Sequence, residues 1–317
     1  MSIVTIRDSR SGSQATIAPE RGFNCFQFLA FIDGRMVDVI AADGGFAAGA
    51  GGPSRDGIPI LFPFPNRIRA GRYTWQGREY QLPLTGGHPN TLHGFCLDRA
   101  WRVVEQQENS VWGRFQLSVD APDRVPYWPC DFILEVRYSI AGAALAMDVT
   151  IENPGEVPLP WGFGTHAYFK LPLAPGGGGS AADCVIQAPA QQEWVLDQCL
   201  PTGQRRDVSR LTDLRSGAAL EGRKLDHVLT GLRPAGDVIE TIVRDPHAGL
   251  RTVQSFPRDF RELVVFTPPW TDAVCLEPYT CVTDAVNLQQ QGVDAGWRTL
   301  APGGRFEAQI VIRVETE

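Results

Sequence analysis

The sequence predicts an all-β protein built mainly from antiparallel strands. Apolar residues recur at every second position over residues 132–140 and again over 145–151, with the turn Ala141-Gly142 between the two runs. This is the period of a strand that buries one face. We find no long amphipathic helix and no internal repeat. Antiparallel strands, each with one mostly solvated face, are therefore expected.

The first third of the chain contains two predicted hairpins. A strand is expected over residues 2–6, followed by a hairpin of 26–32 and 36–40 that turns at Asp33-Gly34. Glycines dominate residues 44–57, which predicts a surface loop. A second hairpin is expected over residues 73–82, because aromatic and aliphatic residues alternate on both sides of Gln76-Gly77.

The second half of the sequence begins with residues that lack a regular pattern and ends with predicted strands. Residues 175–180 are rich in glycine but lack the Gly-Lys-Ser/Thr ending of a phosphate-binding loop, so a loop tip is expected. Turn residues dominate 183–236. A buried strand is predicted over 263–266, with a stop at Pro268. Residues 309–314 supply a last strand.

Charge and composition favour a small neutral or polar ligand. The chain has 317 residues, and 29 Lys and Arg face 36 Asp and Glu, a net charge of −7. No basic block is present, so the phosphate contacts that nucleic-acid binding requires are not expected. The length allows one large core. The oligomeric state is not indicated.

A soluble, cytoplasmic protein is expected. The first residues lack the basic and apolar regions of a signal peptide, and no apolar run approaches the ~20 residues that a membrane helix needs. The seven cysteines form no Cys-x-x-Cys pair. An odd, scattered set of this kind suits free thiols in a reducing compartment, and zinc held by cysteines is not expected.

Two histidines are candidates for chemistry. His166 lies among aromatic residues and glycines in 160–170, and its side chain can donate and accept a proton near neutral pH. His93, between Leu92 and Gly94, suits a ligand-facing group at a strand end. For both residues the alternative is a buried ring with a structural partner.

Glu277 is the strongest single candidate, because it lies inside the apolar stretch 274–279. Burial there would raise its pKa toward that of a useful base, whereas a strand-end glutamate facing water is the alternative.

Arg67 follows several prolines and could donate two hydrogen bonds to an oxygen-rich ligand, unless it is solvated or paired. Asp226 stands beside His227, which by itself fits an exposed pair without function.

Several segments together resemble the aldose 1-epimerase (galactose mutarotase) family. The matching segments follow the family's order and are 66–73, 92–94, 165–169, 225–227, 276–280 and Asn287-Leu288. The resemblance implies that residues 1–317 form one large antiparallel β-sandwich domain of the galactose mutarotase-like type. It also implies interconversion of the α and β anomers of a free aldose.

The resemblance implies a role for each candidate residue. Glu277 would be the general base on the anomeric hydroxyl, and His166 the general acid on the ring oxygen. His93, Arg67 and Asp226 would hold sugar hydroxyls. Ring opening needs one proton removed and one delivered, so neither a metal nor an organic cofactor is expected. We hypothesise that the segments around these residues converge on one pocket.

Some features leave alternatives open. Residues 165–170 read Thr-His-Ala-Tyr-Phe-Lys where many mutarotases have Asn-His-Ser-Tyr-Phe-Asn, so the preferred sugar is not predicted. A hexose-6-phosphate 1-epimerase would need a cationic pocket, to which Arg67, Arg69 and Arg72 could contribute. A non-catalytic sugar-binding module is a further alternative. The last is an iron site made from His93, His166 and Glu277.

Overall fold

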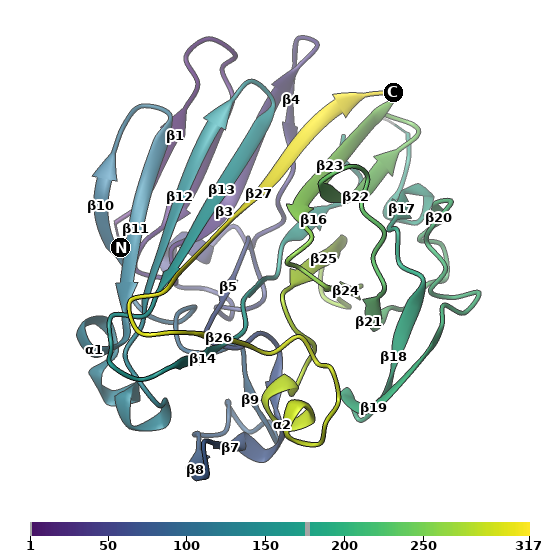
Figure 1. The fold of residues 1–317 in the computed structure, drawn as a ribbon. Helices are drawn as coiled ribbons and strands as arrows, with labels where there is room; N and C mark the ends of the chain where they lie inside the picture. Colours follow the sequence, from purple (N-terminus) through teal and green to yellow (C-terminus); the bar gives the residue numbers. More distant parts are fainter. Residues whose placement is uncertain (1, 175–177) are drawn as a thin grey trace.

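The computed structural model describes residues 2–174 and 178–317, and a nine-stranded antiparallel sheet is its largest element (Figure 1). In spatial order its strands are β10 (Arg102–Gln106), β11 (Ser110–Gln116), β12 (Ile133–Ala141), β13 (Ala144–Glu152), β27 (Arg305–Thr316), β23 (Leu250–Pro257), β22 (Val238–Asp245), β17 (Val185–Gln187) and β20 (Ala218–Ala219). The last long strand of the chain, β27, therefore lies in the middle of the sheet, between β13 and β23.

A second, eight-stranded sheet carries the candidate site. Its strands are β19 (Leu200–Asp207), β18 (Gln192–Asp197), β21 (Asp226–Thr230), β24 (Glu262–Phe266), β25 (Ala273–Tyr279), β15 (Gly164–Thr165) and β5 (Ile60–Leu61), with β16 (Tyr168–Lys170) also paired to β25. Strand β25 has neighbours on both sides, and all seven of its residues are buried.

Smaller sheets and short helices complete the fold. The four-stranded sheet consists of β1 (Val4–Arg7), β2 (Gln14–Ala18), β3 (Asn24–Ile32) and β4 (Arg35–Asp38). The strand pairs are β6 (Arg67–Ile68) with β9 (Thr91–Leu92), β7 (Arg72–Trp75) with β8 (Arg78–Gln81), and β14 (Leu159–Trp161) with β26 (Arg298–Leu300). The helices are α1 (Leu117–Asp120), α2 (Ala285–Gln290) and the 3-10 turns η1 (Phe46–Ala48), η2 (Arg69–Gly71), η3 (Pro122–Tyr127) and η4 (Ala181–Asp183). Among residues 2–174 and 178–317, no helix combines the length and the apolar character needed to cross a bilayer.

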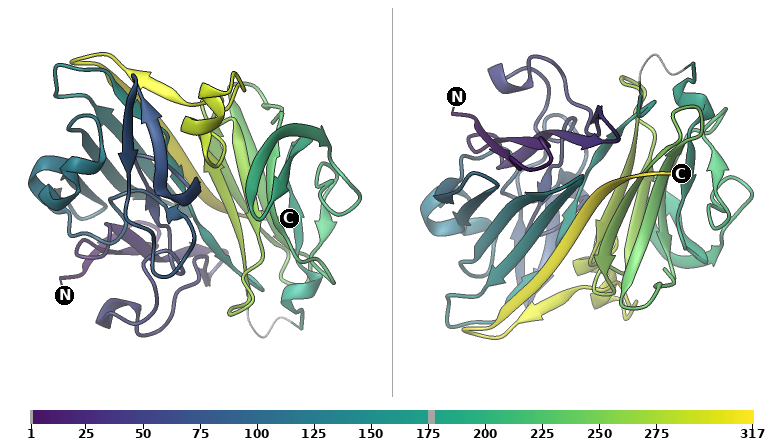
Figure 2. Two further views of the ribbon diagram at one scale, coloured as in Figure 1. Left: turned by 90° about the horizontal axis from the view of Figure 1, so that it is seen from below. Right: turned by 90° about the horizontal axis from the view of Figure 1, so that it is seen from above.

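Side chains from the three large sheets meet in one hydrophobic core. Phe28 enters it from the four-stranded sheet, Val149 from the nine-stranded sheet and Leu263 from the eight-stranded sheet. Figure 2 shows the purple N-terminal strands lying against the teal strands, in agreement with the contacts of β1 with β11 and β12. Burying a side chain of this size contributes ~1.5–3 kcal/mol, so this shared core holds the sheets together.

Most of the predicted strands are confirmed. The hairpin at Asp33-Gly34 is β3 and β4, the hairpin at Gln76-Gly77 is β7 and β8, and the alternating runs are β12 and β13. The strand before Pro268 is β24. The predicted first strand is displaced to Val4–Arg7, and the last strand is longer than its alternating core. The predicted antiparallel, all-β class is therefore confirmed.

Two parts of the chain differ from the expectation. Residues 183–236 are not mainly turns, because they contain β17, β18, β19, β20 and β21. Strand β19 lies at the sheet edge and exposes most of its residues, so it lacks the apolar alternation of a half-buried strand. The largely β region 111–151 is interrupted by α1 and η3. Of the predicted loop tip at 175–180, residues 175–177 lie outside the described residues.

Candidate active site

Strand β25 presents three candidate site residues on one face. Because successive residues of a strand point to opposite sides, Cys275, Glu277 and Tyr279 share one face. Val274 and Leu276 point the other way and belong to the hydrophobic core between the sheets. Glu277 therefore lies on the side of the sheet away from that core, yet it is only 1% exposed.

His166 is placed opposite Glu277 by the two short strands that flank it. Gly164 of β15 pairs with Tyr279, and Tyr168 of β16 pairs with Cys275. His166 is the middle one of the three residues between these two pairings, and its Nε2 lies 3.3 Å from Glu277 Oε1. The strand register thus brings together two residues that are far apart in the sequence.

Aromatic rings fix the orientation of His166. The Tyr168 ring stacks on the imidazole with centroids 4.7 Å apart, and Phe266 meets it edge-on at 6.2 Å. The Tyr168 hydroxyl donates a hydrogen bond of 2.8 Å to the Ser54 carbonyl, which holds the stacked ring in place. Burial lowers the pKa of His166 to about 3.

The Glu277 carboxylate is engaged through both oxygens. Oε1 faces His166, and Oε2 accepts a hydrogen bond from the Tyr279 hydroxyl. Burial raises the pKa of Glu277 well above its ordinary value, while the Tyr279 bond opposes this shift. The negative charge of Asp226 raises the pKa further, and the positive charge of Arg67 lowers it. Burial thus favours the neutral forms of Glu277 and His166, whereas Tyr279 and Arg67 favour the carboxylate.

His93 extends the site beyond His166. It follows β9 with a φ of 64°, and its backbone N–H donates a hydrogen bond of 2.7 Å to the Asn66 carbonyl. Its ring centroid lies 5.8 Å from that of His166. Burial lowers the pKa of His93 well below its ordinary value, assisted by the charges of His166 and Arg67, so the ring is neutral near pH 7.

Arg67 is the cation that faces the site. Its Nη1 donates to Asn66 Oδ1 at 2.6 Å, and its charge lowers the pKa of Glu277 and Tyr279. Arg69 lies 3.6 Å from Asp284, and Arg72 donates to Gln81 Oε1 at 2.8 Å. What distinguishes Arg67 from these two arginines is that its charge acts on Glu277 and that its buried Nε has no hydrogen-bond partner among the described residues.

Asp226 lies at the rim of the same sheet face. It opens β21 and pairs in register with Phe266, next to β25. Its side chain is exposed, and its Oδ2 accepts a 3.7 Å hydrogen bond from the Cys199 thiol. All five residues proposed from the sequence thus gather in one region, with His166 and Glu277 in direct contact and Arg67 and Asp226 within electrostatic reach.

Several polar atoms in this region lack a protein partner. Within the described parts of the chain, Arg67 Nε, His93 Nδ1 and His166 Nδ1 are buried without a hydrogen bond. Buried polar atoms are seldom left unpaired, because each one costs about 1–3 kcal/mol. Three such atoms on neighbouring residues indicate a place for an oxygen-rich ligand.

The sequence analysis missed the role of Tyr279 and Cys275. Both lie two positions from Glu277, so the alternation of a strand places them on its face. The Cys275 thiol and one ligand atom each of His166 and Glu277 lie within 4.8 Å of one another, so these three residues could hold a metal ion. This group contains Cys275 in place of His93, and a sulfur ligand suits zinc better than the iron of an oxygenase.

A family model and related proteins match this chain. The model described as aldose 1-epimerase matches residues 54–313. The uncharacterised protein YihR of Escherichia coli is 26% identical over 238 residues, which cover 74% of this chain and 72% of YihR. Galactose mutarotase of Rattus norvegicus is 30% identical over 141 residues, which cover 44% of this chain and 39% of that protein.

Solved structures share the fold over the full length. A galactose mutarotase-like protein from Clostridium acetobutylicum has a TM-score of 0.85 at 20% identity, covering 100% of this chain and 99% of that one. The galactose 1-epimerase of Lactobacillus acidophilus has a TM-score of 0.72 at 17% identity, with coverage of 100% and 99%. These likenesses confirm the predicted galactose mutarotase-like fold.

Proposed function

This chain belongs to the aldose 1-epimerase family, and we propose that it interconverts the α and β anomers of a free aldose. The observation that carries the proposal is the contact of His166 Nε2 with Glu277 Oε1 at 3.3 Å on a buried sheet face. The reaction needs one group that removes a proton and one that delivers a proton. This pair supplies both.

The proposed reaction starts with the pair holding one proton, on His166. Glu277 removes the proton from the anomeric hydroxyl, and the C1–O1 bond becomes a carbonyl as the C1–O5 bond breaks. His166 gives its proton to O5. The open aldehyde turns about its C1–C2 bond, and the ring closes on the other face with both proton transfers reversed. Each partner contributes about 10²–10⁴ in rate.

The surrounding residues support this sequence of steps. The Tyr279 hydroxyl and the Arg67 charge both favour an ionised Glu277, which is the form that accepts the proton. The unpaired atoms Arg67 Nε and His93 Nδ1 are suited to sugar hydroxyls. Asp226, at the rim, can accept a hydrogen bond from a further hydroxyl.

The site favours an unphosphorylated sugar. A phosphate carries about −1.5 to −2 charges at neutral pH and is best held by several cations. Of Arg67, Arg69 and Arg72, only Arg67 has a charge that acts on Glu277, and Arg69 and Arg72 interact with Asp284 and Gln81. We therefore place hexose-6-phosphates behind free hexoses as substrates. The seven free cysteines support a reducing, cytoplasmic compartment for this activity.

Polarimetry of fresh sugar solutions tests the proposal. We expect the protein to accelerate the approach of α-D-glucose or α-D-galactose to anomeric equilibrium, compared with buffer alone. Glucose 6-phosphate should be accelerated less. Calorimetric binding of these sugars without any acceleration would instead support a non-catalytic sugar-binding module.

A further inference from the structure

Three side chains of different chemistry meet at the proposed acid–base pair. A nitrogen of His166, a carboxylate oxygen of Glu277 and the Cys275 thiol all lie within 4.8 Å of one another. Nitrogen, oxygen and sulfur are the three kinds of ligand atom that Zn²⁺ takes from proteins. In the described parts of the chain, no other three His, Cys, Asp or Glu residues come together in this way. The proposed anomer exchange does not use the Cys275 thiol.

The spacing of the pair fits a tetrahedral zinc site. Zn–N and Zn–O bonds of about 2.0–2.2 Å at tetrahedral angles place the two ligand atoms about 3.3–3.6 Å apart. His166 Nε2 and Glu277 Oε1 are 3.3 Å apart. Cys275 precedes Glu277 by two residues on β25, so its thiol lies on the same face of the sheet. Three protein ligands leave a fourth position open for water, as in catalytic zinc sites.

The surrounding residues hold the three ligands in place. Tyr168 stacks on His166, and the Tyr279 hydroxyl donates to Glu277 Oε2, which leaves Oε1 free to face an ion. Contacts of this kind orient metal ligands and increase metal affinity. The ligand residues are also buried, with exposed fractions of 7% for His166, 0% for Cys275 and 1% for Glu277. The site is therefore largely formed before an ion enters.

The charge balance favours a divalent cation with an affinity for sulfur. A Zn²⁺ ion bound by a thiolate, a carboxylate and a neutral imidazole forms a group without net charge, which suits a buried place. The thiol releases its proton to solvent as the Zn–S bond forms. Arg67 and Asp226 act on Glu277 with opposite charges, so together they leave this balance unchanged. Ca²⁺ and Mg²⁺ prefer oxygen ligands and should not compete with Zn²⁺.

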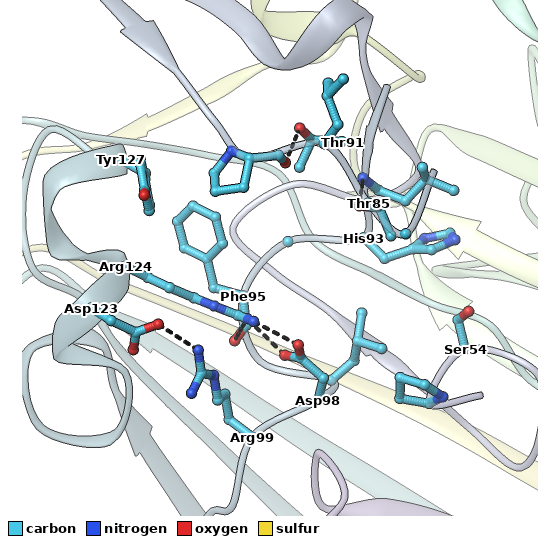
Figure 3. Close-up of a pocket in the computed structure, with 17 residues that line it drawn as sticks. Ser54, Thr85, Thr91, His93, Phe95, Asp98, Arg99, Asp123, Arg124 and Tyr127 are labelled. Carbon is cyan, nitrogen blue, oxygen red and sulfur yellow. Dashed lines mark hydrogen bonds and ion pairs between the residues drawn. The ribbon is translucent and has the colours of Figure 1, made fainter. Parts of the chain in front are cut away.

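A cleft of about 500 Å³ gives an ion a path from solvent (Figure 3). His93 lines the cleft, and its ring centroid lies 5.8 Å from that of His166. Ser54 also lines it, and its carbonyl accepts the hydrogen bond from Tyr168, the ring that stacks on His166. In Figure 3 His93 and Ser54 lie on the same side of the view, away from Tyr127. The cleft thus reaches the surroundings of His166, which is the most exposed of the three ligand residues.

We propose that His166, Cys275 and Glu277 form a Zn²⁺-binding site and that the bound ion inhibits anomer exchange. The inhibition rests on the proposed function, whereas the binding does not. The ion occupies the Nε2 and Oε1 atoms that transfer protons in the proposed reaction, so sugar and ion exclude each other. Zinc held by several cysteines stays unexpected, because the sequence has no Cys-x-x-Cys pair, but this site needs only one cysteine.

Calorimetric titration with Zn²⁺ tests the binding, after a chelator has been added to the protein and dialysed away. We expect one ion per chain in the wild type. Cys275→Ser should weaken binding about 100-fold, the upper end of what changes around metal ligands cost. Cys25→Ser is the matched control, because Cys25 is an equally buried free thiol on β3 of the four-stranded sheet. Unchanged binding in Cys275→Ser, or lost binding in Cys25→Ser, would overturn the inference.

Cobalt identifies the ligand in the wild-type protein itself. Co²⁺ accepts the same ligands as Zn²⁺ and gives a charge-transfer absorption band when a thiolate binds it. We expect this band in the wild type and its loss when Zn²⁺ is added in excess. A wild-type protein without the band, or a band that persists in Cys275→Ser, would exclude Cys275 as a ligand.

Polarimetry with α-D-glucose tests the inhibition. Zn²⁺ should raise the KM of the wild type and leave kcat unchanged, because ion and sugar compete for the same atoms, and a chelator should restore the rate. Cys275→Ser, compared with its own rate without zinc, should need about 100-fold more Zn²⁺ for the same effect. Zinc that binds without slowing the exchange, or that accelerates it, would overturn the inhibitory role. If the wild type shows no exchange even without zinc, the proposed function fails, and calorimetry alone decides on the zinc site.

Discussion

At the scale of a single residue, two opposing effects act on the pKa of Glu277. Burial raises its pKa, and the hydrogen bond from Tyr279 lowers it. In the proposed reaction the pair shares one proton, and the reactive form has that proton on His166 and a charged Glu277. A donor that favours the carboxylate therefore increases the reactive fraction. We therefore propose that Tyr279 is a positioning residue for Glu277.

Replacing Tyr279 by phenylalanine should move the pH profile. Losing the hydrogen bond raises the pKa of Glu277, because a bond to the charged form favours that form. The alkaline limb of kcat/KM, where the pair loses its last proton, should shift to higher pH. The plateau should fall on the order of tenfold if the shift is about one pKa unit.

Tyr80→Phe provides a matched control for this substitution. Tyr80 stacks on Tyr73 away from the pair, so its profile should match the wild type. An alkaline limb that stays in place in Tyr279→Phe, or moves to lower pH, would contradict the assigned role. A general loss of rate without a shift would indicate a purely structural role.

How far single residues could be predicted depends on the signal that each one carries. Glu277 was identified because an acidic residue within a run of apolar residues is unusual, and the structure buries it as expected. Tyr279 and Cys275 look like ordinary strand residues in the sequence, although they share its face. The partner of a buried group is a property of three-dimensional packing, so no local pattern revealed the bond to Glu277.

At the scale of elements, β15 and β25 pack closely enough that no side chain fits between them at Gly164. A Cβ added there would lie 2.2 Å from Tyr279 Cδ1 and 3.0 Å from Pro65 Cβ. The glycine is thus required by the close approach of the Tyr279 ring. The ring that holds Glu277 is itself held by the strand that leads to His166.

Gly164→Ala should therefore damage both stability and activity. Forcing a methyl group into a packed site costs about 1–3 kcal/mol, and the displaced Tyr279 ring loses its alignment with Glu277. Denaturant unfolding and polarimetry measure the two effects. Gly44→Ala, where the added Cβ meets nothing within 4 Å, is the control and should change neither. Wild-type activity in Gly164→Ala would show that the ring position is not critical.

Elements were predictable where one face is buried and the other is not. The hairpins β3–β4 and β7–β8 carry both alternation and a turn signal, so they were found. Strand β17 was missed because it has only three residues, and β19 because it lies at a sheet edge, where exposed polar residues hide the period. Strand β18 was missed because its buried residues Glu193 and Trp194 are consecutive and its register shifts after Trp194, so it lacks a regular alternation. Sequence periodicity reports burial, and edge strands bury little.

At the scale of the whole molecule, folding buries an acid that the proposed reaction does not use. Glu262 of β24 pairs in register with Tyr279 and is fully buried. Its Oε2 accepts a 2.8 Å hydrogen bond from Trp194 Nε1. Burial raises the pKa of Glu262 to about 7 from an ordinary value of 4.5. The folded state therefore binds this proton more tightly than the unfolded chain does.

Stability should consequently fall as the pH rises toward neutrality. The contribution of Glu262 is fully present below pH 4.5 and is lost as the pH rises through about 7. At ~1.4 kcal/mol per pKa unit, the loss is about 3 kcal/mol. The test measures the free energy of unfolding of the wild type and of Glu262→Gln from pH 5 to pH 8. Over this range the wild type should lose stability relative to the variant by about 3 kcal/mol.

Glu307→Gln serves as the control for this pH dependence. Its side chain is 65% exposed on β27, so the difference from the wild type should stay flat over the same pH range. A flat difference for Glu262→Gln as well would mean that Glu262 stays charged in the folded protein.

Sheet order was not predictable from the sequence alone. The candidate site joins segments near residues 67, 93, 166, 226 and 277, and local patterns do not indicate which distant strands pair. Their convergence was a hypothesis supported by the family resemblance. The cleft beside His93 was not foreseen, because its walls come from separate loops and η3. That residues 1–317 form a single domain stays a prediction.

The most direct test of the His166–Glu277 mechanism is the rate of anomer exchange in Glu277→Gln. Glutamine keeps the size of the side chain but cannot accept the proton from O1, so the exchange rate of α-D-glucose or α-D-galactose should fall by about 10²–10⁴. Sugar binding should persist by calorimetry, and Glu307→Gln should keep the wild-type rate. Exchange at the wild-type rate in Glu277→Gln would contradict the proposed role of Glu277.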